Sequence, residues 1–519
     1  MGEQTRAPLT QLLVIGVDGG EPALIEQWMA SGDLPNVAKL GERSLRGRVC
    51  NPHALEAGAV WPTFHTGLLP GHQPQYDGQR YFDSQTYSDK WFDGQSVEPA
   101  LWQHLSALGK RCLVIDAPYV RLDPSLDGVM ILDWASHVAA DGKTAALQTH
   151  PAALKDDLIA RLGPDPAGGV DCDQRKIESI ADHQRFLDDY LERIERKGEL
   201  TVSMLEEGGW NYAETVFTGL HCVGHRLWHI RDESHPRHDA ATHQAIGDPI
   251  RDSYQAFDSA LGRILEVVDD RTTVLVYVSH GMGPQYTGTG LLDKMLSVIE
   301  QGKRVRSTSR PLKARVRDLW FRVPGGVRSA VRPLRKPFSG ALDINVADEV
   351  PDRRTRRFFE VHANNATGGV RLNLKGREGQ GLVEPAEARS ILEDLRTAIL
   401  DVRNAETGQP IARQCIITRD LYDGPYESYL PDLLVVWNRD APIRVISSTR
   451  VGTIHQDYAN QRTGDHTPFG MFMASGPGIE PSVLDRDVNA ADFAPSLIAM
   501  MGGELAQTDG TTLSALVGE

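Results

Sequence analysis

Residues 215–229 read TVFTGLHCVGHRLWH and carry two histidines, His221 and His225, four positions apart. Side chains with this spacing share one face of a helix, so both imidazoles could bind one metal ion. The preceding run, 213–218, is short, apolar and β-prone, which predicts a buried strand that gives way to a helix at the carboxyl edge of a sheet. The same spacing also fits two packed helix residues, so the interpretation depends on the rest of the chain.

A second stretch, Leu12–Val17, is a continuous apolar run that ends in Asp18-Gly19-Gly20. It predicts a buried parallel strand with a carboxylate at its carboxyl end. Asp18 is therefore placed to be a ligand, although it could also cap the helix that we expect after Pro22.

The remaining elements alternate between strand and helix, which favours an α/β fold. They are a helix at 102–108, a strand at 112–115, a helix within 175–207, a helix at 254–268, a strand at 272–278 that ends before Ser279-His280, strands within 357–374, a helix at 385–403, a strand at 432–437, and a strand boundary at His466.

Composition excludes several classes of protein. The 519 residues contain 55 Lys and Arg against 70 Asp and Glu, a formal charge of −15, which argues against nucleic acid as a general partner. The cysteines at 50, 112, 172, 222 and 415 show no CxxC spacing. There is no secretory leader pattern and no run of about 18 apolar residues, so we expect a cytoplasmic protein without a transmembrane segment.

Residues 303–337 differ from their surroundings, because they contain twelve Lys or Arg and one acid, Asp318. We expect them to belong to an inserted basic lid within residues 284–362. Such a lid could draw an anionic substrate or lipid surface towards the site. A solvated insert paired with acidic neighbours is the alternative.

Short motifs along nearly the whole chain resemble the alkaline phosphatase superfamily, in particular its type I phosphodiesterase/nucleotide pyrophosphatase branch. They are DGG at 18–20, WPTFHTGLLPG at 61–71, HxxxH at 221–225, SHGM at 279–282, PDLLVVW at 431–437 and GDHTPFGMFMASGPG at 464–478. The resemblance implies one α/β domain over residues 1–519, with a mostly parallel central sheet sandwiched by helices and the lid 284–362 inserted in it.

The resemblance also implies two divalent ions at the carboxyl edge of the sheet. One would be held by His221, His225 and His466, and the other by Asp18 and His280 with an aspartate and a nucleophilic Thr or Ser. The chain departs from this pattern, since His221 replaces a carboxylate, Ser279 replaces the aspartate of a DHG motif, and Ala57 stands where the nucleophile is expected. A histidine-rich set favours zinc, with iron or manganese as alternatives. We expect one tight ion, with two ions, the second held more loosely, as the alternative.

Ala57 leaves three explanations open. It could have been introduced to disable a hydroxyl nucleophile. Water could attack directly, with Glu56 as ligand or general base. The chain could also have lost hydrolysis and kept a binding role. Thr63 and Thr66 are weaker candidates for the nucleophile.

The function that these motifs predict is metal-dependent hydrolysis of a phosphate ester, a phosphodiester or pyrophosphate rather than a monoester. The substrate is then a small phosphate-ester anion, and Asn364, Asn365 and Arg371 are polar groups that could contact it. They also fit turn and edge-strand residues that face water. The alternative function is a weak or inactive member that binds an anion or a partner. Sulfate or phosphonate chemistry is a third option, although the CxPxR signature of sulfatases is absent.

Overall fold

The computed structural model describes residues 9–78, 80–92, 98–136, 147–169, 171–288, 290–301, 352–364, 366–455 and 462–518. The predicted basic run 303–337 and Asn365 lie outside these residues. The lid boundaries therefore stay a prediction.

A large central sheet organises the molecule, and ten strands are assigned to it in the described residues, in the order β20-β2-β19-β9-β1-β8-β5-β6-β7 with β21 beside β2. Its parallel centre consists of β9 (Thr273–Val278), β1 (Leu12–Val17), β8 (Tyr212–Phe217), β5 (Cys112–Ile115) and β6 (Gly128–Leu132). The outer strands are β7 (Gln148–His150), β19 (Phe469–Ser475), β2 (Leu45–Cys50), β20 (Ser482–Val483) and β21 (Val488–Asn489). The predicted mostly parallel sheet is confirmed.

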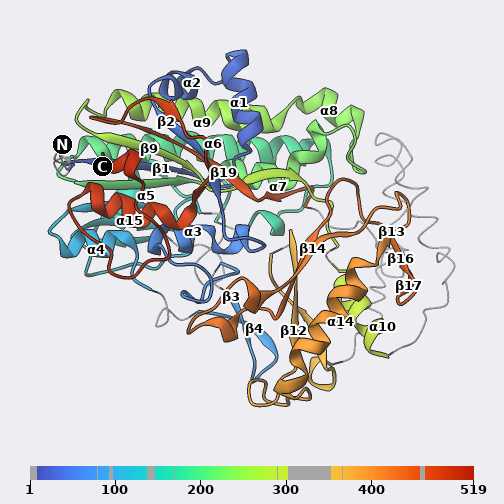
Figure 1. The fold of residues 1–519 in the computed structure, drawn as a ribbon. Coiled ribbons are helices and arrows are strands. Elements are labelled where there is room, and N and C mark those ends of the chain that lie inside the picture. The colour runs from blue at the N-terminus through green and yellow to red at the C-terminus, as the bar shows by residue number, and fades with distance from the viewer. Residues whose placement is uncertain are drawn as a thin grey trace.

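Both faces of this sheet are covered by helices, as Figure 1 shows. Alternate residues of β1 point to opposite sides, so Leu13 and Ile15 join one core cluster while Leu12 and Val14 join the other. The first cluster contains buried residues of α1 (Pro22–Ser31), α2 (Pro35–Glu42), α6 (Ile180–Glu206), α7 (Gly219–Arg231) and α9 (Pro249–Glu266). The second contains residues of α3 (Glu56–Thr66), α4 (Leu101–Ala107), α15 (Phe493–Met500) and α16 (Ser514–Val517).

A separate antiparallel sheet of four strands lies beside the main layers. Its order is β11 (Phe358–Val361), β12 (Thr367–Leu372), β15 (Leu433–Trp437) and β14 (Ala412–Ile417). Its own hydrophobic core includes residues of α10 (Leu292–Gln301) and α14 (Ala388–Leu400). This second sheet was not part of the sequence prediction.

Smaller elements complete the described part of the fold. They are β3 (Arg80–Asp83), β4 (Ser88–Trp91), α5 (Leu154–Leu162), α8 (Ala240–Ile246), β10 (Gly281–Pro284), β13 (Arg403–Asn404), β16 (Val445–Ser448), β17 (Gly452–His455) and β18 (Gly464–Thr467). The pair β10–β18 matters most for function, because it continues directly from the carboxyl end of β9.

Candidate metal centre

The carboxyl ends of three neighbouring strands bring the predicted ligands together. Asp18 directly follows β1, and His280 lies two positions beyond the end of β9. The helix α7, which carries His221 and His225, begins just after β8. Because β1 pairs with both β8 and β9, these segments meet at one point of the sheet edge. His466 arrives from β18, where it stands opposite Met282 of β10.

Three histidines converge through their Nε2 atoms. The Nε2 of His221 lies 2.7 Å from that of His466 and 2.9 Å from that of His225. All three side chains are buried. Imidazole nitrogens this close need a proton or a cation between them, because two facing lone pairs repel each other. The set is therefore of a kind that could bind a divalent ion.

Main-chain carbonyls fix the direction of two imidazoles. With its hydrogen on Nδ1, His225 donates to the carbonyl of Gly464 at 2.8 Å, which leaves the Nε2 lone pair facing His221. In the same way His280 Nδ1 lies 3.2 Å from the carbonyl of Gly281. Burial lowers the pKa of His280, which favours its neutral, ligating form.

His280 lies between the three histidines and Asp18. Its Nε2 is 3.5 Å from Asp18 Oδ1, and one nitrogen from each of His221, His280 and His466 lies within 4.8 Å of the others. His225, Asp465 and His466 form a second such group, so Asp465 is a possible ligand that sequence reasoning missed. The sequence signal that could have identified Asp465 as a ligand is its position directly before His466.

Asp18 is already hydrogen-bonded. Its Oδ1 accepts from Trp61 Nε1 at 2.9 Å and from Ser279 Oγ at 3.1 Å. Trp61 reaches it by lying over Gly16, where an added Cβ would come within 2.7 Å of the indole. Ser279, which stands at the expected aspartate position, thus contributes a donor to the carboxylate where a second carboxylate would have repelled it.

Two charged residues that the sequence analysis did not single out hold the β10–β18 pair. Glu21 accepts from the Met282 N–H at 3.0 Å and from the Thr467 hydroxyl at 2.9 Å. Arg439 donates to the carbonyls of Pro284 (2.7 Å), Asp465 (3.0 Å) and His466. Both therefore position His280 and His466. Glu21 could have been noticed as the residue before Pro22, but nothing local marks Arg439.

The start of α3 provides the candidate general base. Glu56 is its first residue and Ala57 its second, and both are buried. Glu56 Oε1 accepts from the Ala54 N–H at 2.9 Å. Burial raises the pKa of Glu56, and main-chain hydrogen bonds together with His53 and Arg439 offset this only in part.

The three predicted substrate residues differ in their surroundings. Asn364 has a φ of 59° and uses its Oδ1 to accept from two N–H groups of its own turn. Its buried Nδ2 has no hydrogen-bond partner in the described part of the chain. Asn365 lies outside the described residues. Arg371 is buried and donates to Glu378 at 2.7 Å and to Ser84 at 2.8 Å. Its predicted contact with substrate is therefore not favoured.

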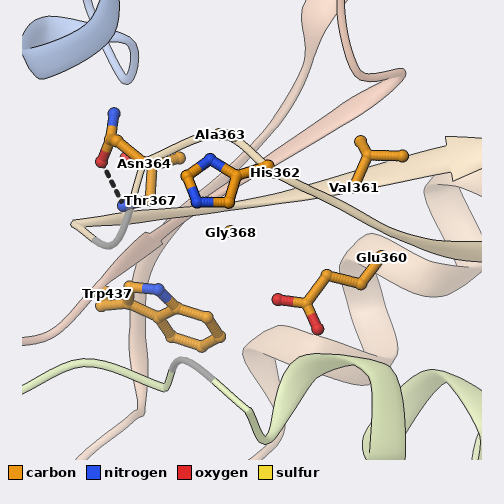
Figure 2. A pocket seen from close by; sticks show the side chains of 8 residues that line it. All are labelled: Glu360, Val361, His362, Ala363, Asn364, Thr367, Gly368 and Trp437. Atoms are coloured by element: carbon orange, nitrogen blue, oxygen red, sulfur yellow. Dashed lines mark hydrogen bonds between the residues drawn. The ribbon is translucent and has the colours of Figure 1, made fainter. Parts of the chain in front are cut away.

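A small cavity of about 40 Å³ adjoins Asn364. Figure 2 shows Glu360, His362 and Trp437 around it. Burial raises the pKa of Glu360 to about 7, and the neighbouring Asp293 adds to this.

The loop that carries His362 is connected to α3. His362 Nδ1 is 2.7 Å from Asp77, the residue before Gly78. The Gly78 N–H donates to the carbonyl of Gly58 in α3. The loop 362–364 is thus linked through Asp77 to the start of α3.

A family model for type I phosphodiesterases and nucleotide pyrophosphatases matches residues 12–445. The chain belongs to this family. The predicted resemblance is confirmed, and the match includes Asp18, the α3 segment and both α7 histidines, while His466 lies beyond it. Family membership supports a phosphoester hydrolase of the phosphodiesterase or pyrophosphatase type.

One of two similar solved structures supports the fold of this family member. Phosphonoacetate hydrolase from Sinorhizobium meliloti 1021, in complex with phosphonoacetate, is 14% identical, with a TM-score of 0.50 and 96% of each chain covered. Murine ectonucleotide pyrophosphatase/phosphodiesterase 5 is 10% identical, with a TM-score of 0.49 and coverage of 96% of this chain and 97% of that one. No curated protein sequence matches significantly.

Among the residues that the structure describes, no helix combines the length and the hydropathy that crossing a bilayer requires.

Proposed function

We propose that the chain is a metal-dependent hydrolase of phosphate esters that works with one tightly held divalent ion. The convergence of His221, His225 and His466 at 2.7 and 2.9 Å carries this proposal. Three imidazole donors favour zinc, with iron or manganese as alternatives. A second, looser ion near Asp18 and His280 would have to displace the hydrogen bonds from Trp61 and Ser279.

The proposed substrate is a small anionic phosphodiester or pyrophosphate, and this preference comes from the family. An ion at the three-histidine set would supply positive charge for the phosphoryl oxygens and lower the pKa of a nearby water. The residues must then remove the proton of the attacking water. Ala57 offers no hydroxyl, so we assign this role to Glu56, one position earlier, as general base. Asn364 would donate from its Nδ2 to a substrate oxygen.

Two further expectations belong to this proposal. We place the protein in the cytoplasm, which its five free cysteines favour, since oxidising compartments favour disulfides. We also propose that the basic residues in the predicted lid 284–362 draw the anionic substrate to the site. If charge reversal at Arg315, Arg317 and Arg322 leaves activity at low salt unchanged, the steering role is wrong.

The second candidate function is binding without efficient catalysis. In that case the chain is a weak or inactive member of the family that binds an anionic ligand or a protein partner. Ala57 and Ser279 favour it, because both remove groups on which the covalent route of the family depends. A protein of this kind would bind metal and show no turnover.

The deciding experiment combines metal analysis with hydrolysis. Purified protein is assayed for bound metals and for cleavage of an aryl phosphodiester and the matching monoester, before and after chelation. We expect about one ion per chain, diester cleavage, loss of activity on chelation and recovery with zinc. Metal without turnover of any phosphoester would favour the binding protein.

The pH profile tests Glu56. A general base must be ionised, and the pKa of Glu56 is raised above its usual 4.5, so kcat/KM should increase with pH over a range that begins above that value. Glu56→Gln should lose this acid limb and about 100-fold or more in kcat. A Glu56→Gln protein with the same profile as the unchanged chain would exclude the role.

A further inference from the structure

The loop before α3 holds a histidine that the proposed mechanism leaves unused. Asn51 Nδ2 donates to the carbonyls of Ser279 (2.7 Å) and Pro468 (2.9 Å). The loop is therefore fastened to the two segments that carry His280 and His466. His53 follows two residues later, and Ala54 then takes a left-handed conformation with a φ of 63°. This turn directs the Ala54 N–H to Glu56.

His53 stands between buried Glu56 and solvent. Its Nδ1 lies 3.9 Å from Glu56 Oε1, and the two side chains are 49% and 11% exposed. Its Nε2 is 2.7 Å from the Oε1 of Gln414. Since an amide oxygen only accepts, Nε2 carries the hydrogen, and the Nδ1 lone pair is free to take a proton from the side of Glu56.

The four-stranded sheet fixes His53 in this place. Gln414 belongs to β14, and Tyr422, which follows that strand, donates its hydroxyl to the carbonyl of His53 at 2.8 Å. The other ionisable groups that act on Glu56 are Arg439 and Tyr422. Neither of these two is a ready proton acceptor at neutral pH, because a guanidinium remains charged and burial raises the pKa of Tyr422 well above its usual value.

We propose that His53 is the group through which Glu56 passes its proton to solvent. This inference rests on the proposed function, in which Glu56 accepts a proton from the attacking water. The water oxygen forms a bond to phosphorus, the bond from phosphorus to the leaving oxygen breaks, and the leaving oxygen takes up a proton from solvent. The Glu56 carboxyl then gives its proton through one water to Nδ1 of His53, which lies 3.9 Å away, and the imidazolium releases it to bulk water. Both side chains return to their starting states.

A purely structural His53 would hold only Gln414 in place. The role of proton carrier and the structural role differ in one respect: a base added to the solution can replace a lost proton carrier, but it cannot replace a lost structural contact. For a proton carrier, His53→Ala should lower kcat about tenfold or more with little change in KM, and millimolar imidazole in solution should restore part of the loss. His53→Gln keeps a donor for Gln414 and has no titrating nitrogen, so it should be as slow as His53→Ala.

His72 provides the matched control. It is 40% exposed and its Nδ1 lies 2.7 Å from Asp509, so it is also a half-exposed histidine paired with a carboxylate. His72→Gln should retain full kcat and gain nothing from imidazole. Full kcat in His53→Gln, or equal stimulation of both variants by imidazole, would overturn the proposal.

A titration keeps this test separate from the proposed function. The pKa of Glu56 is followed by NMR in the unchanged chain, in His53→Gln and in His72→Gln. Because His53 lowers the pKa of Glu56, that pKa should rise in His53→Gln and stay the same in His72→Gln. An unchanged pKa of Glu56 in His53→Gln would overturn the inference even in an active enzyme. If the chain hydrolyses no phosphoester, the proposed function fails and the relay fails with it, while the titration still decides whether the two groups exchange charge.

Discussion

The two halves of the candidate site lie at the same sheet edge but satisfy their polar groups differently. In the half formed by His221, His225 and His466, nitrogens face nitrogens at 2.7 and 2.9 Å. In the half around Asp18, the carboxylate accepts from an indole N–H and a hydroxyl. The first arrangement needs a proton or a cation between the facing nitrogens, whereas the Asp18 carboxylate already accepts two hydrogen bonds. A hydrogen bond to a charged group contributes roughly 1.5–3 kcal/mol, so a second ion would have to compensate for two of them.

The largest expected effect comes from removing a ligand of the histidine half. His225→Ala should lose the bound ion and lower hydrolysis by about 100-fold or more, because it removes a donor that Gly464 has oriented. Metal analysis and steady-state kinetics measure both changes, and His104→Ala in α4 is the control. An unchanged ion content would show that the three nitrogens do not bind the metal.

Converting the Asp18 half into an ion site is the next test. Ser279→Asp removes a hydroxyl donor and adds a second carboxylate, so the number of bound zinc ions should rise from about one to about two per chain. Asparagine has the size of aspartate without its charge, so the Ser279→Asn protein should still bind about one zinc ion per chain. If the aspartate variant also binds a single ion, the hydrogen bonds of Asp18 do not explain the difference between the halves.

A hydroxyl at position 57 tests whether the Asp18 half works as it stands. Ala57→Thr alone should leave kcat within about threefold, because the proposed tight ion belongs to the three histidines and not to the Asp18 half, where it would lower the pKa of the new hydroxyl. Combined with Ser279→Asp, it should raise kcat further than either change alone. Strong activation by Ala57→Thr alone would instead identify the chain as a disabled enzyme with an ordinary covalent route.

The smallest effect is expected from Trp61→Phe. This change removes the indole N–H that donates to Asp18, so the free energy of unfolding should fall by about 1.5–3 kcal/mol while the ion content stays the same. Urea denaturation measures the first quantity and metal analysis the second. If the Trp61→Phe protein binds a second ion, the hydrogen bond from Trp61 alone prevents Asp18 from binding a metal.

Local sequence patterns were sufficient to predict the parallel part of the fold. The apolar runs at 12–17 and 112–115 coincide with β1 and β5, and the amphipathic helix within 175–207 became α6. A run that is buried on both faces has few other conformations available. The same logic placed Asp18, His221, His225 and His280 at strand ends.

What the sequence did not predict depends on contacts between distant segments. Trp61 reaches Asp18, and Arg439 reaches the carbonyl of His466, only through tertiary packing. The antiparallel strand β19 inside the parallel sheet, and the separate four-stranded sheet, likewise have no local pattern that distinguishes them from edge strands. The proposed roles of Glu56 and Asn364 remain predictions.

The position of β19 has a consequence for how the chain is made. β19 lies between β2 and β9, and the assigned sheet partners of β2 among the described residues are β19, β20 and β21. Residues 45–50 are synthesised early, yet they find these partners only when the chain beyond residue 469 has left the ribosome. Until then the nascent protein exposes an unpaired strand and lacks His466. Cotranslational folding should therefore stall before this point, and chaperones that shield strand edges should bind the growing chain.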